Sequence, residues 1–217
     1  MRMKDKIVVV TGAHTGIGAA SAKALAEEGA HVLAVDVDKG VEETVEEIKE
    51  AGNQASAFIV DISEQSEVET FAETLKSQYG YIDALFNNAG VDNSAGRIHK
   101  YPVEVFDRIM GVDLRGTFMM TKYLIPLMLD NGGSIINTAS FSGQAADLYR
   151  SGYNAAKGGV INFTRSTAIE YGRENIRANA IAPGTIETPL VDKLSGTEEE
   201  ESGRSCLLYT SPSPRDS

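Results

Sequence analysis

The chain has one cysteine and no long apolar run, and these absences exclude several classes of protein. Cys206 is alone among the 217 residues, so an internal disulfide is impossible and a reducing compartment, the cytoplasm, is expected. No segment approaches the roughly 18 unbroken apolar residues of a membrane span. The opening residues, MRMKDKIVVVTG, lack the apolar length and the cleavage site of a signal peptide.

Basic residues are also scarce. Lys and Arg number 20 against 31 Asp and Glu, which gives a net charge of -11 and a pI near 4.8. Such a balance argues against nucleic acid or an anionic membrane as the main partner. The remaining composition, 42% hydrophobic and 24% charged, is ordinary for one globular domain of this length.

What the chain does contain is an alternation of short apolar runs with longer amphipathic ones. Runs such as IVVV are typical of strands buried on both faces of a parallel sheet. The strand candidates are Ile7–Thr11, Val32–Asp36, Ala55–Asp61, Ile82–Asn87, Ser134–Ser140 and Ala178–Ala182. The helix candidates are Gly16–Glu28, Val41–Ala51, Glu64–Tyr79, Val103–Leu129 and Ser151–Tyr171. This alternation predicts an α/β fold: a Rossmann-like, doubly wound parallel sheet with helices on both faces, in a single domain over residues 1–195.

The first strand ends in TGAHTGIG, which places Gly12, Gly16 and Gly18 at the start of the first helix. In a doubly wound sheet, ligands bind beyond the carboxyl ends of the strands. Gly12 permits a tight turn, Gly16 lets the backbone approach a pyrophosphate, and Gly18 allows close helix–strand packing. Three glycines also suit an ordinary turn and helix start, but the flanking strand and helix favour a dinucleotide site.

Asp36 ends the second strand, 24 residues after Gly12. A carboxylate at this place accepts hydrogen bonds from the adenosine ribose hydroxyls and repels a 2′-phosphate. Thr15 stands in the glycine loop where a basic residue would favour NADP. Both features favour NAD over NADP, and a solvated aspartate at a strand end is the alternative interpretation.

Polar residues also end the third and fourth strands. Asp61 could meet the amino group of an adenine, and Asn87–Gly90 (NNAG) combines small residues that leave room for a cofactor with two asparagines. Asn87 suits a structural role equally well, because an asparagine can tie neighbouring strand ends together.

A possible catalytic group follows the fifth strand. Ser140 ends that strand, and Tyr153 and Lys157 lie one helical turn apart on one face. Interconversion of an alcohol and a carbonyl needs a proton donor, and a phenol can serve. Its pKa must fall by about 3 units, or about 4 kcal/mol, and an ammonium about 4 Å away supplies roughly that much. A Tyr/Lys pair is also common on ordinary amphipathic helices.

Together these motifs resemble the classical short-chain dehydrogenase/reductase family over about residues 4–195: the glycine loop, NNAG, Ser–Tyr–xxx–Lys, and the strand with Pro-Gly at 176–189. The resemblance implies that Tyr153 is the general acid/base, that Ser140 steadies the substrate oxygen, and that Lys157 holds the nicotinamide ribose and lowers the pKa of Tyr153. It implies no metal ligand. The implied cofactor contacts are Gly12, Thr15, Gly16, Ile17, Gly18, Asp36, Asp61, Ile62, Asn88, Ala89, Gly90, Tyr153, Lys157, Pro183, Gly184, Ile186 and Thr188.

One position departs from the family pattern. Asp113, in GVDLRGTF, stands where the family usually has an asparagine that seats a water in a proton relay to the lysine. A carboxylate can still accept hydrogen bonds, and its charge would favour a protonated Lys157. We therefore include Asp113 among the catalytic candidates as part of a relay.

The resemblance implies an NAD(H)-dependent oxidoreductase that moves hydride between nicotinamide and a small secondary alcohol or ketone, and a homotetramer built through the helices at 103–129 and 151–171. A 3-oxoacyl-acyl-carrier-protein reductase is an alternative, disfavoured by Asp36, although Arg97, Lys100 and Arg150 could form a basic patch for an acidic carrier. A sugar dehydrogenase is another. The glycine spacing disfavours a nucleotide-sugar epimerase, and the intact Tyr/Lys pair disfavours a non-catalytic dinucleotide-binding protein.

The last residues change in character. Family members commonly continue to a further helix and a last edge strand, whereas residues 196–217 predict neither. The stretch CLLYTSPSPRD can be back-translated to a sequence that closely resembles the end of a transposase-based sequencing adapter. We interpret residues 206–216 as translated adapter, so that the last strand is missing and 196–217 is a disordered or artefactual tail; a regulatory tail is the alternative.

Overall fold

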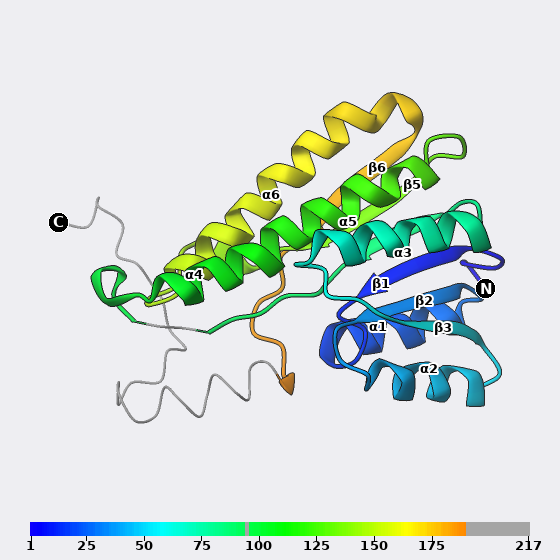
Figure 1. The fold of residues 1–217 in the computed structure, drawn as a ribbon, viewed down its shortest axis with the longest axis horizontal. Coiled ribbons are helices and arrows are strands. Elements are labelled where there is room, and N and C mark those ends of the chain that lie inside the picture. Colours follow the sequence, from blue (N-terminus) through cyan, green and yellow to red (C-terminus); the bar gives the residue numbers. More distant parts are fainter. Residues whose placement is uncertain (94–95, 190–217) are drawn as a thin grey trace.

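The computed structural model describes residues 1–93 and 96–189, which build one six-stranded sheet (Figure 1). Neighbouring strands are all parallel, in the order β3-β2-β1-β4-β5-β6. The strands are β1 Ile7–Thr11, β2 His31–Asp36, β3 Gln54–Ile59, β4 Ala84–Asn87, β5 Gly133–Thr138 and β6 Ile176–Ile181. The predicted Rossmann-like α/β fold is confirmed.

The strand order reverses between β1 and β4. Val10 of β1 pairs with Ala34 of β2 on one side and with Phe86 of β4 on the other. The connections from these two strands lead to opposite halves of the sheet, so their carboxyl ends border the crevice where ligands bind in open α/β folds. The glycine loop and the NNAG segment follow these two strands.

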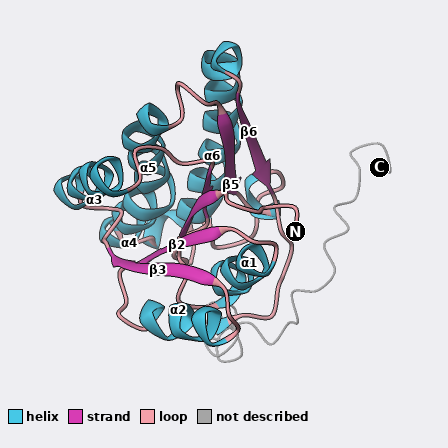
Figure 2. Cartoon of the chain, turned by 90° about the vertical axis from the view of Figure 1, so that its right-hand side faces the viewer, coloured by secondary structure: helices cyan, strands magenta, loops and turns pink. Residues whose placement is uncertain are grey.

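Helices cover both faces of the sheet (Figure 2). The helices are α1 Gly16–Glu27, α2 Val41–Glu50, α3 Gln65–Gln78, α4 Val103–Ile109, α5 Thr117–Leu124 and α6 Ser151–Tyr171. Val8 and Val10 pack with α1 and α2 in one apolar cluster, while Val9 packs with α3 and α5 in a second. Because successive side chains of a strand point to opposite faces, burial on both sides explains the unbroken run IVVV.

The helix predicted at 103–129 is a continuous rod with three kinds of turn. Between α4 and α5 lies a π-helical segment, η2 (Met110–Gly116), and the rod ends in a 3-10 turn, η3 (Ile125–Leu127). A hydrophobic pattern averages over such a local change of pitch, so the sequence did not predict it. Single π-helical turns are frequent at functional sites, and this one carries Asp113.

Several strand boundaries differ from prediction by two residues. β4 begins at Ala84 rather than at Ile82, because the Ile82 N–H donates to the carbonyl of Leu127 and not to a strand. β3 ends at Ile59, and the N–H of Asp61 donates to the Glu67 carboxylate.

β6 forms an edge of the described sheet. Only Ile176 of its six residues is buried. The expected tail and the expected loss of a last strand fall on residues outside the described range, so both stay predictions. No helix within residues 1–93 and 96–189 is long and apolar enough to cross a membrane.

Candidate active site

The loop between β1 and α1 brings its glycines against the end of β4. Gly12 has φ +66°, and a Cβ there would lie 2.8 Å from the Cα of Ala89. A Cβ on Gly18 would lie 1.9 Å from the carbonyl oxygen of Gly12. The tight turn and the close packing predicted for these two positions are both present, while Ile17 between them is half-buried against the cluster under α1.

Asp36 lies at the end of β2, beside the same loop. One of its carboxylate oxygens accepts the backbone N–H of His14 at 3.1 Å, and the other accepts the N–H of Asp38 at 3.0 Å. A carboxylate has about four acceptor sites, so capacity remains for ribose hydroxyls. Thr15 is exposed next to it and makes no side-chain capping bond to α1.

Asn88 links the ends of three strands at the crevice. Its backbone N–H donates to the hydroxyl of Thr11 at 2.9 Å, and its side-chain oxygen accepts the hydroxyl of Thr138 at 3.3 Å. Ala89 also donates its N–H to Thr11, at 3.0 Å. These bonds hold the NNAG backbone close to the glycine loop.

Asn87 takes the structural role that the sequence left open. Its amide donates to Thr121 at 3.1 Å and to Asn137 at 2.9 Å, and Asn137 donates in turn to Thr164 at 2.9 Å. All four side chains are buried, so this ladder ties β4 and β5 to α5 and α6.

Asp61 and Ile62 follow β3 toward the same edge of the sheet. One oxygen of Asp61 accepts both the N–H and the hydroxyl of Ser63, at 2.8 and 2.6 Å. Ile62 is buried, and its side chain fills the space that a Cβ on Gly116 would occupy. The predicted contact with an adenine amino group would therefore use the other oxygen of Asp61.

Ser140, Tyr153 and Lys157 lie around the end of β5. The ammonium of Lys157 is 5.5 Å from the centre of the Tyr153 ring and donates to the carbonyl of Thr138 at 2.9 Å. The lysine side chain is almost wholly buried. α6 carries both Tyr153 and Lys157, so the predicted one-turn spacing on one face is present.

Asp113 completes this group from the π-helical segment. One carboxylate oxygen accepts the N–H of Val91 at 2.8 Å, and the other lies 3.2 Å from the Lys157 ammonium. Gly90 leaves the necessary space, because a Cβ there would lie 3.1 Å from the Asp113 oxygen. Burial raises the pKa of Asp113 in spite of the lysine charge. Burial lowers the pKa of Lys157, but the charges of Asp113 and Tyr153 outweigh it and leave that pKa raised.

The pKa of Tyr153 differs in direction from the expectation. Burial raises it, Lys157 lowers it as predicted, and Asp113 raises it again, so that the pKa lies above its ordinary value. The main physical reason is burial of the phenol, which disfavours its charged form, and the Asp113 carboxylate 3.2 Å from the Lys157 ammonium adds to it.

The segment after β6 connects the two halves of the site. The N–H of Phe141, next to Ser140, donates to the carbonyl of Pro183 at 3.0 Å. Farther along, the methyl of Thr188 lies where it would be 3.1 Å from a Cβ on Gly16. Gly184 and Ile186 lie between these contacts and are exposed. The structure thus brings the catalytic candidates and the cofactor candidates to one edge of the sheet.

A chain of hydrogen-bonded polar side chains next to Ser140 was not predicted from the sequence. The hydroxyl of Ser142 donates to the carboxylate of Asp147, and Arg150 pairs with both Asp147, at 3.2 Å, and Asp92. The guanidinium of Arg150 also lies 5.0 Å from the centre of the Tyr153 ring. The loop FSGQAADLYR matches no motif, so only the fold could reveal these contacts. They correct the expectation that Arg150 joins a basic patch, because its charge is already paired.

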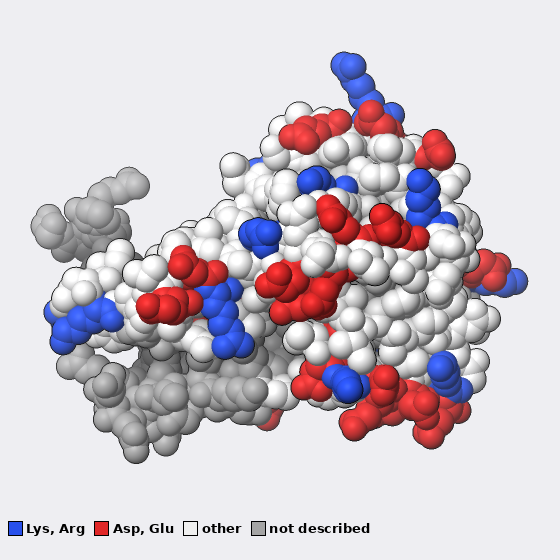
Figure 3. All heavy atoms as spheres, in the orientation of Figure 1, with Lys and Arg blue, Asp and Glu red and all other residues white. Residues whose placement is uncertain are grey.

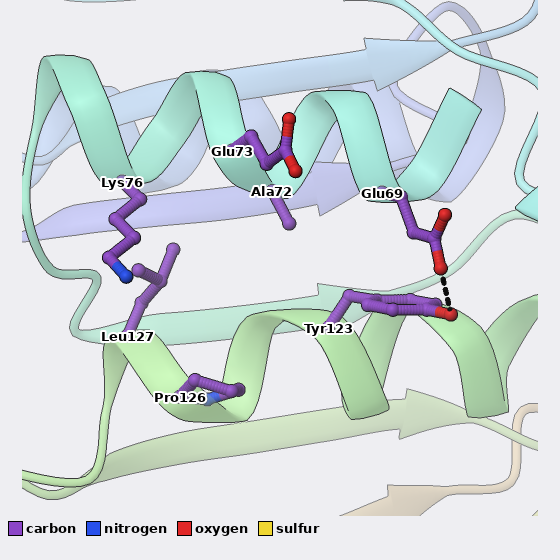
Figure 4. A pocket seen from close by; sticks show the side chains of 7 residues that line it. All are labelled: Glu69, Ala72, Glu73, Lys76, Tyr123, Pro126 and Leu127. Atoms are coloured by element: carbon purple, nitrogen blue, oxygen red, sulfur yellow. Dashed lines mark hydrogen bonds between the residues drawn. The ribbon is translucent and has the colours of Figure 1, made fainter. Parts of the chain in front are cut away.

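A separate groove of about 270 Å³ lies between α3 and the end of the α5 rod (Figure 4). Its wall includes Glu69 and Tyr123, whose hydroxyl donates to the glutamate at 2.5 Å. No catalytic candidate lines this groove, so we do not assign the reaction to it.

Comparisons with known proteins agree with this geometry. Residues 6–199 match the family model described as short chain dehydrogenase. The chain is 59% identical to the uncharacterized oxidoreductase YxbG of Bacillus subtilis over 203 residues, which cover 93% of this chain and 74% of that protein.

Two relatives carry more specific names. Levodione reductase of Leifsonia aquatica is 36% identical over 221 residues, covering 99% of this chain and 83% of that protein. A crystal structure of levodione reductase superposes with a TM-score of 0.89 at 36% identity, covering 94% of this chain and 80% of the other. A crystal structure of NAD+-bound xylitol dehydrogenase superposes with a TM-score of 0.82 at 32% identity, covering 85% of this chain and 72% of the other.

Proposed function

Since this chain belongs to the short chain dehydrogenase family, we propose that it is an NAD-linked dehydrogenase of small secondary alcohols and the corresponding ketones. The observation that carries the proposal is the convergence of Ser140, Tyr153 and Lys157 beside the crevice that the glycine loop and Asp36 border.

The residues present fit a nicotinamide dinucleotide. The glycine loop has no side chains at its closest contacts, so a pyrophosphate can approach its backbone, and the Asp36 carboxylate beside the loop can accept further hydrogen bonds. Gly12, Gly16, Asp36 and Asn88 to Gly90 would hold the cofactor, together with Thr188. When bound, the cofactor accepts or supplies the hydride.

The chain's own residues perform the proton chemistry. In oxidation, the oxygen of Tyr153 takes the proton of the substrate hydroxyl as a hydride leaves the carbon that bears this hydroxyl. In reduction, Tyr153 returns a proton to the carbonyl oxygen. Ser140 donates to the substrate oxygen and fixes its position. Lys157, held by Thr138 and Asp113, keeps a positive charge next to the phenol.

The preference for NAD rests on Asp36. A 2′-phosphate at the adenosine ribose would meet this carboxylate, and like charges disfavour binding. Titration with NADH and NADPH should show at least tenfold tighter binding of NADH, and Asp36→Asn should reduce that ratio. Equal binding of both cofactors by the unchanged protein would refute this part of the proposal.

For the substrate, we propose an alicyclic ketone or alcohol. Large apolar side chains border the site and are exposed, namely Phe141, Leu148, Tyr149 and Ile186. Levodione reductase, a similar protein, is named for a dione. A panel of cyclic ketones and alcohols followed by NADH absorbance should give turnover that Tyr153→Phe abolishes and the remote Tyr81→Phe retains. Activity that survives in Tyr153→Phe would remove the assigned mechanism.

A polyol is the second candidate. The carboxylate of Asp147 lies two hydrogen bonds from Ser140 and can accept further hydroxyl protons, and one structural neighbour is a xylitol dehydrogenase. Including xylitol in the same panel decides between the two, since an apolar rim should favour the cyclic ketone.

A further inference from the structure

Ser140 is held by Ser142 through two contacts. The backbone N–H of Ser142 donates to the Ser140 oxygen at 3.2 Å, and the Ser140 hydroxyl donates to the Ser142 oxygen, also at 3.2 Å. Ser142 itself is buried, so few other partners can reach these atoms. Two contacts restrict a serine side chain that could otherwise rotate among three staggered positions.

Asp147 gives this pair a direction. An ionised carboxylate only accepts hydrogen bonds, so the proton of Ser142 must point at Asp147. The oxygen of Ser142 is then left as an acceptor toward Ser140. The proton of Ser140 has three possible acceptors: the Ser142 oxygen, the phenol oxygen of Tyr153, whose pKa a hydrogen bond with Ser140 lowers, and a substrate oxygen.

The far end of the chain is fixed to the rest of the fold. Arg150 joins Asp147 to Asp92, whose side chain is wholly buried. Asn154, next to Tyr153 on α6, accepts the N–H of Asp147 at 3.3 Å and donates to its carbonyl at 2.8 Å. The loop before α6 is therefore held on the helix that carries the phenol.

We propose that Ser142 and Asp147 are positioning residues, which hold the oxygen of Ser140 beside the substrate oxygen while leaving its proton able to turn from Ser142 to the substrate. This inference rests on the proposed function, in which Ser140 contacts the substrate. Neither residue needs to touch the ketone for this role, in which each acts through Ser140.

A double-mutant cycle tests the proposal. Ser142→Ala should lower kcat/KM for the best ketone about tenfold, because a contact to a reacting group contributes about that factor. In the Ser140→Ala background the same change should have less than a twofold effect, since the group it positions is gone. If Ser142→Ala lowers kcat/KM by the same factor in the Ser140→Ala background, the proposal is overturned, because a general structural defect would act equally in both backgrounds.

Asp147 provides an independent arm. Asp147→Asn keeps an acceptor oxygen and should lose less activity than Asp147→Ala. The loss of kcat/KM in Asp147→Ala should equal that in Ser142→Ala, and combining the two changes should lower kcat/KM little further. Ser166→Ala is the matched control: among the described residues, the hydroxyl of this exposed serine of α6 donates a hydrogen bond to Glu170 at 3.4 Å, far from the Ser140 chain, and its removal should leave kcat/KM unchanged. Equal losses of kcat/KM for Asp147→Asn and Asp147→Ala would overturn the proposal that the acceptor oxygen of Asp147 orients the hydroxyl of Ser142.

Binding separates a failure here from a failure of the proposed function. 2-Piperidone is a cyclic amide whose carbonyl accepts a hydrogen bond as a ketone does, but which is not reduced. It is titrated into the NADH complexes of the four proteins of the double-mutant cycle: the unaltered protein, Ser142→Ala, Ser140→Ala and the double variant. The affinity should fall with Ser142→Ala only where Ser140 is present. If this binding pattern is seen but no ketone is turned over, the proposed dehydrogenase activity is refuted and the positioning role is not. If Ser142→Ala binds the amide as tightly as the unaltered protein, or the unaltered protein does not bind it, the positioning role is overturned.

Discussion

Asp113 combines a fully buried carboxylate with a direct contact to Lys157, and this pairing sets the electrostatics of the site. A lone ammonium near Tyr153 would favour the phenolate. Burial of the phenol raises the pKa of Tyr153, and Asp113, 3.2 Å from that ammonium, raises it further, so it stays above its ordinary value.

Asp113→Asn should therefore shift the pH dependence of alcohol oxidation. In the mechanism that we propose, oxidation needs the phenolate, so the rate is expected to rise with pH through the apparent pKa of Tyr153. Burial and Asp113 raise that pKa, and removal of the Asp113 charge lowers it. We expect the midpoint of the kcat/KM profile to move about one pH unit toward acid, a change of about 1.4 kcal/mol.

The control for this shift is Asp107→Asn, which removes an exposed carboxylate from α4. Its profile should match that of the unaltered protein. A midpoint that moves toward alkali in Asp113→Asn would mean that the buried Lys157 loses its proton without Asp113, contrary to the assignment.

At the scale of elements, the ladder Asn87–Asn137–Thr164 joins the sheet to the helices that carry the site. Asn137 is fully buried, and its two side-chain groups are used by Asn87 and Thr164. A buried amide that loses its partner costs about 1–3 kcal/mol.

Thr164→Val should lower the free energy of unfolding by about that amount, because the Asn137 amide then has no acceptor. Thr167→Val is the matched control, since that buried hydroxyl bonds only to the carbonyl of Phe163 among the described residues. Urea unfolding of both variants measures the difference; equal stabilities would show that the Asn137 amide finds another partner.

Two elements illustrate what a pattern can predict. The βα alternation predicted the six strands and the α-helices of the described residues, because burial on one or both faces imposes a period. The π-helical turn at Met110–Gly116 was missed, since one extra residue in a turn barely alters that period; this turn carries Asp113, whose carboxylate lies 3.2 Å from Lys157.

For the whole molecule, the negative charge is unevenly spread. Acidic side chains gather over α2, at the lower right of Figure 3, where Glu42, Glu43, Glu46, Glu47 and Glu50 are exposed. Like charges four residues apart on a helix repel, and salt screens them.

Raising NaCl from about 20 to about 200 mM should therefore raise the melting temperature, because the Debye length falls from tens of ångströms to about 8–10 Å. Replacing Glu46 and Glu50 by glutamine should raise the melting temperature at low salt and reduce the response. A melting temperature that is independent of salt would contradict this account.

Exposed apolar side chains on α4, α5 and α6 suggest where copies would associate. Phe106, Phe118 and Ile169 are 38%, 46% and 82% exposed. We expect sedimentation to show an oligomer that Phe118→Glu dissociates, whereas Ile59→Glu on the β3 edge leaves it intact. A monomer at all concentrations would remove the expected tetramer.

The sequence by itself determined the layered α/β fold, the glycine loop at Gly12 and the Tyr153/Lys157 pair, because hydrophobic period and motif spacing are local properties of a chain. The tertiary structure alone decided that Asn87 is structural and that Arg150 is paired with Asp92 and Asp147. It also placed Asp113 3.2 Å from Lys157, where the sequence had indicated only that its charge would favour a protonated lysine. The pairs Asp113–Lys157, Asn87–Asn137 and Asp92–Arg150 are 44, 50 and 58 positions apart, so only folding brings their side chains together. Electrostatic effects depend on distance and burial in space, which a linear pattern does not encode.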